Sequence, residues 1–169
     1  MRTVHKNRMF KVKEITVNMR GRKEKAYGIY KPDTVAVLPI TSSGKILLEE
    51  QYRPPLGKKI YEIPAGHLER GESPADAAKR ELEEETGFRT SKLRYMTVSY
   101  QAPGILCCKE YIYLAEKLGK GKQSLDMDEE ITVREVSIAK VMRMIETGKI
   151  TDSKTILSML YYKRFFAKG

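Results

Sequence analysis

The order of apolar and polar residues predicts that strands come first in this chain. Alternating or continuous apolar segments, separated by turn residues, predict strands over residues 9–17, 26–30, 34–40, 45–51, 60–63, 93–100, 110–118 and 131–136. Residues 34–40 are almost entirely apolar, which is typical of a strand buried on both faces. The turn 41–44, Thr-Ser-Ser-Gly, joins this strand to its expected partner.

A helix is predicted over residues 74–86. Ser73 is a good N-cap, Pro74 suits the first helical position, and Asp76 stands in the first turn. Gly87 is placed to end the helix in the left-handed conformation. The pattern therefore changes from strands to a helix with clear boundaries.

Two more helices are predicted at the C-terminal end, with Ser137 and Asp152 as N-caps and Gly148 between them. Their apolar residues are spaced for packing on a core, and we assign no chemistry to them: Val141, Met144, Ile145, Ile156, Leu157, Leu160 and Tyr161. Strands then a helix, and strands then helices, predict an α+β protein with helices packed against a mixed sheet.

Composition narrows the possible classes of protein. The 169 residues suit one domain, no run approaches eighteen apolar residues, and the N-terminus lacks a signal-peptide core, so we expect a cytoplasmic protein without a membrane span. The net charge of +10 favours an anionic partner. Because the basic residues look dispersed and the densest cluster, residues 20–25, reads as a solvated turn, nucleic acid is unlikely; a small pyrophosphate substrate suits this charge.

The predicted helix 74–86 has two stripes of side chains. Its apolar stripe, expected to face the sheet, consists of Ala75, Ala78 and Leu82. Glu81, Glu84 and Glu85 form an acidic stripe at its margin, at a spacing that places Cβ atoms about 5–6 Å apart.

The acidic stripe is unfavourable without a counter-charge. The Glu81/Glu85 pair costs roughly 0.2–0.5 kcal/mol, and the C-terminal end of a helix favours cations by about 0.3–1 kcal/mol each. Arg80 can compensate Glu84, but Glu81 has only Ala77 and Glu85 four residues away. A solvated acidic face is one interpretation. A bound divalent ion is the other, and oxygen-only ligands favour Mg²⁺, with Mn²⁺ possible.

Residues 66–88 resemble a complete Nudix box. The pattern is Gly, five residues, Glu, seven residues, Arg-Glu, an aliphatic residue, any residue, Glu-Glu, any residue, Gly and an apolar residue. It is filled by Gly66, Glu72, Arg80, Glu81, Leu82, Glu84, Glu85, Gly87 and Phe88. The resemblance implies a Nudix-type α/β/α sandwich that hydrolyses a nucleoside diphosphate linked to another moiety.

The same resemblance implies roles for individual residues. Glu81 and Glu85, with Glu84 beside them, resemble the family's metal ligands, and the backbone carbonyl of Ala65 would be a further ligand. Arg80 resembles the arginine that orients the glutamates, which is compatible with a plain ion pair to Glu84.

Two flanking motifs resemble those of the ADP-ribose pyrophosphatase subgroup: residues 50–53, Glu-Gln-Tyr-Arg, and residues 62–66, Glu-Ile-Pro-Ala-Gly. A proline sixteen residues after Gly87 resembles the subgroup's downstream proline, although it also reads as a turn residue. The implied substrate-binding residues are Arg53, Glu50, Glu62, Leu68 and Pro103. Arg53 suits bidentate phosphate binding, whereas Glu50 and Glu62 could instead be strand-end carboxylates paired with a nearby lysine.

The acidic residues 126–130, Asp-Met-Asp-Glu-Glu, resemble the subgroup's mobile catalytic loop and make Glu129 the expected general base. A solvated loop is the alternative, and a box glutamate such as Glu84 could act instead. The chain departs from the subgroup at Cys107 and Cys108, which we expect to be reduced thiols, where many relatives carry an acidic pair.

The function implied by these resemblances is Mg²⁺-dependent hydrolysis of ADP-ribose to AMP and ribose 5-phosphate. Another nucleotide sugar or a dinucleotide, such as GDP-mannose or ADP-glucose, and a non-catalytic domain that binds a nucleotide or RNA, are the alternatives. The subgroup also implies a homodimer that exchanges N-terminal strands, so we expect residues 1–32 to form such an arm and residues 33–169 the catalytic domain.

Overall fold

The apolar segment after residue 33 forms the centre of a mixed sheet in the computed structural model, which describes residues 1–127 and 129–167. The strand β4 (Thr34–Pro39) is buried throughout, as predicted. It runs parallel to β9 (Glu110–Lys120), and β7 (Ala65–His67) and β8 (Phe88–Ser99) complete the order β7-β4-β9-β8. The short β7, which was not predicted, brings the start of the Nudix-like box alongside β4.

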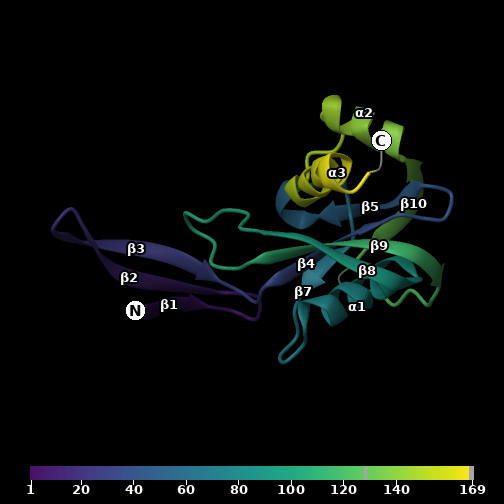
Figure 1. The fold of residues 1–169 in the computed structure, drawn as a ribbon. Helices are drawn as coiled ribbons and strands as arrows, with labels where there is room; N and C mark the ends of the chain where they lie inside the picture. Colours follow the sequence, from purple (N-terminus) through teal and green to yellow (C-terminus); the bar gives the residue numbers. More distant parts are fainter. Residues whose placement is uncertain (128, 168–169) are drawn as a thin grey trace.

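A second, antiparallel sheet has the order β10-β5-β6, with β5 (Lys45–Arg53), β6 (Lys58–Glu62) and β10 (Ile131–Ser137). The 3-10 turn η1 (Pro54–Leu56) connects β5 to β6. The helices α2 (Ile138–Glu146) and α3 (Ser153–Phe165) lie on the side of this sheet, and α1 (Pro74–Thr86) lies on the opposite side of the molecule (Figure 1). The predicted α/β/α arrangement is confirmed, with its sheet divided in two.

The alternation of β4 separates two cores. Ala36 and Leu38 pack into the larger core with β5, β10, α2 and α3. Val35 and Val37 pack against α1 on the other face. Because successive side chains of a strand point to opposite faces, an all-apolar strand serves both cores.

Helix α1 begins and ends where the sequence predicts. The Ser73 side chain accepts a hydrogen bond from the backbone of Asp76, and Gly87 ends the helix with a φ of 74°. The buried apolar face consists of Ala77, Ala78 and Leu82, while Ala75 is only partly buried, so the predicted stripe was rotated slightly. This packing fixes the direction in which the glutamates of α1 point.

The C-terminal helices also have their predicted caps, since Ser137 and Asp152 accept backbone hydrogen bonds at the starts of α2 and α3. Gly148 lies between the two helices with a φ of 69°. The assignment of Leu160 to the core was wrong, because its side chain is exposed. No helix in the described part of the chain is long and apolar enough to cross a membrane.

An N-terminal sheet projects from this body (Figure 1) and consists of β1 (Arg2–Lys6), β2 (Lys11–Met19) and β3 (Arg22–Tyr30). Arg20 and Gly21, both with positive φ, form the tight turn between β2 and β3. The charged residues after Gly21 belong to β3 rather than to a longer turn. The unpredicted β1 is exposed along its length, so it lacks an apolar pattern.

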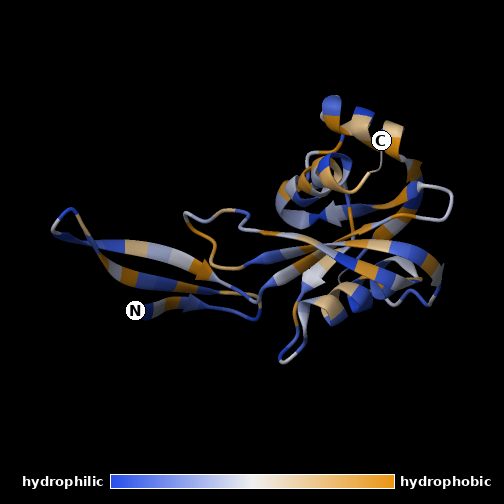
Figure 2. Ribbon diagram, viewed as in Figure 1, coloured by the Kyte–Doolittle hydropathy of each residue, from blue (hydrophilic) through white to orange (hydrophobic). Residues whose placement is uncertain are grey.

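Much of the positive charge lies on this projecting sheet. Residues 1–31 contain ten Lys or Arg and two Asp or Glu, a net charge of +8 within the chain's +10. Figure 2 shows the sheet as mostly hydrophilic, with isolated hydrophobic bands. The positive charge is therefore concentrated in the fold, although it looked dispersed along the sequence.

Candidate active site

The acidic stripe of α1 lies against the strand that precedes the helix. The backbone N–H of Ala65 in β7 donates a hydrogen bond of 2.7 Å to Glu85 Oε2. A Cβ atom at Gly66 would overlap the Glu81 carboxylate, so only glycine allows this approach. The structure thus brings Glu81, Glu85 and Ala65 together, as the resemblance implied.

Arg80 joins the box carboxylates to one another. Its guanidinium donates to Glu72 (Nε to Oε1, 2.9 Å), to Glu81 (Nη1 to Oε1, 2.9 Å) and to Glu84 (Nη1 to Oε2, 2.9 Å). It also donates to the carbonyl oxygen of His67 over 3.0 Å. The expectation that Glu81 lacks a compensating neighbour was wrong, because counting residues four apart misses this adjacent arginine. Together these carboxylates raise the pKa of Arg80, so it stays charged.

Glu81 and Glu85 remain poorly compensated despite these contacts. Burial, with repulsion from Glu84 and Glu129, outweighs the attraction of Arg80 and raises the pKa of Glu81 to about 7. Glu85 is 2% exposed, and burial followed by repulsion from Glu49 and Glu81 raises its pKa well above the ordinary value. Two carboxylates here therefore lack the positive charge that a buried anion needs.

Glu49 of β5 is the neighbour that sequence analysis missed. It is 1% exposed, and burial, with repulsion from Glu62 and Glu129, raises its pKa to about 8 despite the attraction of Lys154 and Arg53. The adjacent Glu50 was predicted instead, because it begins the subgroup motif. The available signal was a carboxylate directly after the apolar residues 46–48 of a predicted strand.

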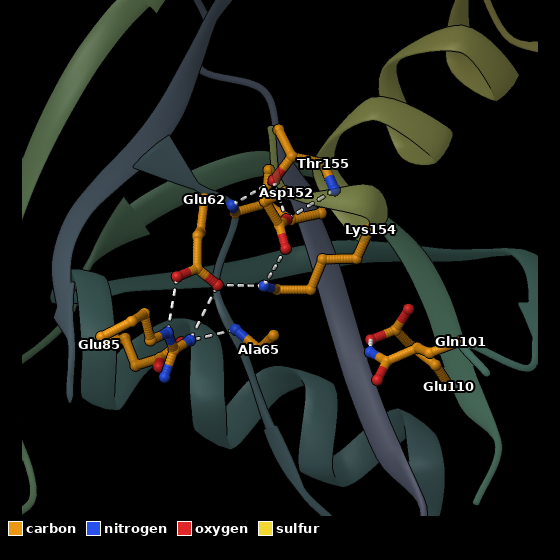
Figure 3. A network of polar contacts seen from close by, with 10 residues as sticks. Glu62, Ala65, Glu85, Gln101, Glu110, Asp152, Lys154 and Thr155 are labelled. Carbon is orange, nitrogen blue, oxygen red and sulfur yellow. Dashed lines mark hydrogen bonds and ion pairs between the residues drawn. The ribbon is translucent and has the colours of Figure 1, made fainter. Parts of the chain in front are cut away.

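The predicted substrate-binding residues Arg53 and Glu62 bind each other. Figure 3 shows Glu62 beside Lys154. Arg53 donates two hydrogen bonds to Glu62, of 2.6 Å from Nε and 2.8 Å from Nη2. Lys154 of α3 also donates to Glu62, and it donates to Asp152 over 3.0 Å. Burial opposes the charge on Glu62, but Arg53 and Lys154 lower its pKa. Glu62 thus has a lysine partner, as the alternative interpretation expected.

The other predicted substrate residues are more scattered. Glu50 accepts hydrogen bonds of 2.8 and 2.6 Å from Arg134, so its partner is an arginine rather than a lysine. Leu68 is half-buried and packs against the core beside α1. Pro103 is exposed, in the segment between β8 and β9. The role of these three residues in substrate binding stays a prediction.

Glu129 of the predicted catalytic loop has an electrostatic effect on the site carboxylates. Glu129 is half-buried, and its charge acts on Glu49, Glu81 and Glu85. Its Oε2 accepts a hydrogen bond of 3.1 Å from the backbone of Asp126. Asp128 of the same acidic stretch lies outside the described residues. The fold thus places Glu129, which is far from the box in sequence, within electrostatic reach of three site carboxylates.

The donor atoms fit a hard divalent cation, although the carboxylates now have protein partners. No three acidic, histidine or cysteine side chains of residues 1–127 and 129–167 are placed to hold an ion as they stand. Arg80 binds Glu81 and Glu84, and the Ala65 amide binds Glu85. The donors are all oxygen, and the buried Glu49 Oε1 nearby has no hydrogen-bond partner within the described part of the chain. Such a set suits Mg²⁺ or Mn²⁺.

Comparisons with known proteins agree on one family. The family model of the NUDIX domain matches residues 30–158. ADP-ribose pyrophosphatase of Bacillus subtilis is 38% identical over 95% of this chain and 91% of that protein. Methanol dehydrogenase activator of Bacillus methanolicus is 38% identical over 83% of this chain and 77% of that protein. A crystal structure of ADP compounds hydrolase shares the fold, with a TM-score of 0.86 and 22% identity over 96% of this chain and 89% of that one.

Proposed function

The chain belongs to the Nudix family, and on that premise we propose that it hydrolyses the pyrophosphate bond of a nucleoside diphosphate sugar. ADP-ribose is the leading substrate, with AMP and ribose 5-phosphate as products. The observation that carries the proposal is the cluster of Glu81, Glu84 and Glu85 around Arg80, beside Ala65. Within this cluster, the buried Glu81 and Glu85 have too little positive charge around them.

Glu81, Glu85 and the carbonyl oxygen of Ala65 would hold the divalent metal, with Glu84 beside them. Bound Mg²⁺ supplies neutralisation of the pyrophosphate charge and a lower pKa for a coordinated water. Arg80 orients the glutamates through its hydrogen bonds to Glu81 and Glu84.

Glu129 acts as the general base in this proposal. A base takes the proton of the attacking water as the oxygen of that water bonds to phosphorus and the bridging P–O bond breaks. The charge of Glu129 already acts on Glu81 and Glu85, which supports its place near the reacting groups. Arg53 would bind a substrate phosphate with its planar guanidinium, which requires it to share or leave Glu62.

We also infer a homodimer built through the N-terminal sheet. This sheet projects from the body (Figure 1), and an exposed sheet edge pairs readily with another chain. Light scattering coupled to gel filtration is expected to give twice the 19.4 kDa mass of the chain. A monomer at micromolar concentration would overturn the dimer without touching the hydrolase proposal. A cytoplasmic location likewise stays a prediction.

A panel of substrates tests the activity. ADP-ribose, ADP-glucose, GDP-mannose and a dinucleotide are assayed with Mg²⁺, with Mn²⁺ and with EDTA, and products are identified by chromatography. We expect the highest kcat/KM for ADP-ribose, AMP among the products, and no turnover in EDTA. Another preferred substrate would keep the reaction but correct the specificity. No turnover of any substrate, together with steeply salt-dependent RNA binding, would instead indicate a binding domain.

A further inference from the structure

We propose that Glu49 of β5 is a further metal-binding carboxylate of this site, acting together with Glu85 of α1. This inference rests on the proposed metal-dependent function and extends its ligand set to a residue outside the Nudix box. The ligands of the ion would then come from both the antiparallel sheet and α1.

The first observation is the state of the Glu49 side chain. Glu49 is 1% exposed, and its Oε1 has no hydrogen-bond partner among the described residues. Buried polar atoms in native proteins nearly always have a partner, so such an atom needs an explanation. A buried carboxylate without a partner costs far more than an unpaired neutral group.

The second observation is the set of charges around Glu49. Lys154 and Arg53 attract it, but both already hydrogen-bond to Glu62, its partner in the register of β5 and β6. Glu62 and Glu129 repel Glu49, and Glu49 in turn repels Glu85. The nearby cations are thus shared with another carboxylate, and negative charge is in excess.

A divalent cation accounts for both observations. It would supply the missing positive charge between Glu49 of β5 and Glu85 of α1, and it would give Glu49 Oε1 a partner. Glu49, Glu85 and the Ala65 carbonyl are oxygen donors, the type that Mg²⁺ and Mn²⁺ prefer. A merely structural carboxylate would instead be expected to have a donor of its own, as Glu62 has in Arg53.

The test measures the affinity of the metal-free full-length protein for Mn²⁺ in the absence of substrate. The electron paramagnetic resonance signal reports the concentration of free Mn²⁺. Glu49→Gln keeps the shape of the side chain and removes its charge. Glu110→Gln is the matched control, because Glu110 is also buried (2% exposed) but hydrogen-bonds to Gln101. Loss of even an outer partner of a metal weakens binding by about 10–100-fold, so we expect at least about 10-fold weaker binding for Glu49→Gln. Glu110→Gln should bind Mn²⁺ as the unchanged protein does.

A second measurement separates this role from a structural one. Without metal, Glu49→Gln removes an uncompensated buried carboxylate and should raise the melting temperature. The same concentration of Mn²⁺ should then stabilise the variant less than it stabilises the unchanged protein, because stabilisation by a ligand increases with the ratio of its concentration to its Kd. A lower melting temperature in EDTA, with the full Mn²⁺-induced shift retained, would overturn the proposal.

The outcomes distinguish this inference from the proposed function. Equal Mn²⁺ affinity and stoichiometry in Glu49→Gln and the unchanged protein, with nucleotide-sugar hydrolysis present, would remove Glu49 from the site alone. An unchanged protein that binds no Mn²⁺ and hydrolyses no substrate would remove both.

Discussion

Two glutamates that face each other in the antiparallel sheet have opposite surroundings. Glu49 and Glu62 are register partners in β5 and β6, and they are 1% and 2% exposed. Glu62 receives hydrogen bonds from Arg53 and Lys154, which lower its pKa against the effect of burial. Glu49 has one oxygen without a hydrogen-bond partner among residues 1–127 and 129–167, and its pKa is raised, first of all by burial.

The contrast between Glu62 and Glu49 lies in the cations that the fold places beside each carboxylate. Burial raises the pKa of both side chains, and the cations that hydrogen-bond to Glu62 reverse this effect only there. Near Glu62 the protein supplies them from β5 and α3. Near Glu49 and Glu85 it supplies fewer positive charges than carboxylates, as is expected where an ion from solution completes the site.

The largest expected change is a loss of stability when one of the cations beside Glu62 is removed. Lys154→Met removes one of two cations from Glu62 and leaves Asp152 without its ion pair. Removing one partner of a buried ion pair costs roughly 3–5 kcal/mol, and we expect the lower end because Arg53 remains. Urea unfolding in EDTA measures this loss. The exposed Lys163→Met on the same helix is the control, and an equal effect from both variants would contradict the structural role.

Removing the charge of Glu85 should lower the rate of catalysis instead. For Glu85→Gln we expect kcat to fall at least ~10²-fold, about 2.7 kcal/mol of barrier, with the fold intact by circular dichroism. Glu83→Gln is the control, because Glu83 lies on the same helix but pairs with Arg89. Wild-type turnover of Glu85→Gln at saturating Mg²⁺ would show that the assigned metal site is wrong.

Glu129 gives a further test of the carboxylate cluster, because its charge acts on Glu49, Glu81 and Glu85. Loss of a general base lowers rates by about 10²–10⁴-fold, and we expect the low end for Glu129→Gln because a box glutamate can substitute in part. Mn²⁺ affinity should change little. Steady-state kinetics beside Glu130→Gln, whose side chain pairs with Lys59, measures this effect. An unchanged kcat would remove Glu129 from the mechanism.

The smallest effect expected is a change in acid stability. Arg53 and Lys154 hold the pKa of Glu62 below its ordinary 4.5, so the folded state binds fewer protons here than the unfolded state. This part of the free energy of unfolding is present above pH 4.5 and is lost as the pH falls through the folded-state pKa. Glu62→Gln should flatten the acid limb of a stability profile measured by urea unfolding, and an unchanged slope would contradict the assignment.

The sequence alone determined the features that depend on local order. The caps Ser73 and Gly87 set the bounds of α1, since capping involves residues close in the chain. The buried β4 followed from its unbroken apolar run. The box motif predicted Glu81, Glu84, Glu85 and Arg80 as site residues. The three-residue and four-residue spacing placed the glutamates on one face of the helix.

Only the tertiary structure decided which distant groups meet. Nothing local joins Glu49 to Glu85 or Glu62 to Lys154, because these pairs depend on strand register and on where α3 packs. Sequence periodicity shows that a side chain is buried, but not which charges share its surroundings. The pKa of a buried carboxylate depends on those charges, so the contrast between Glu49 and Glu62 exists only in the folded chain.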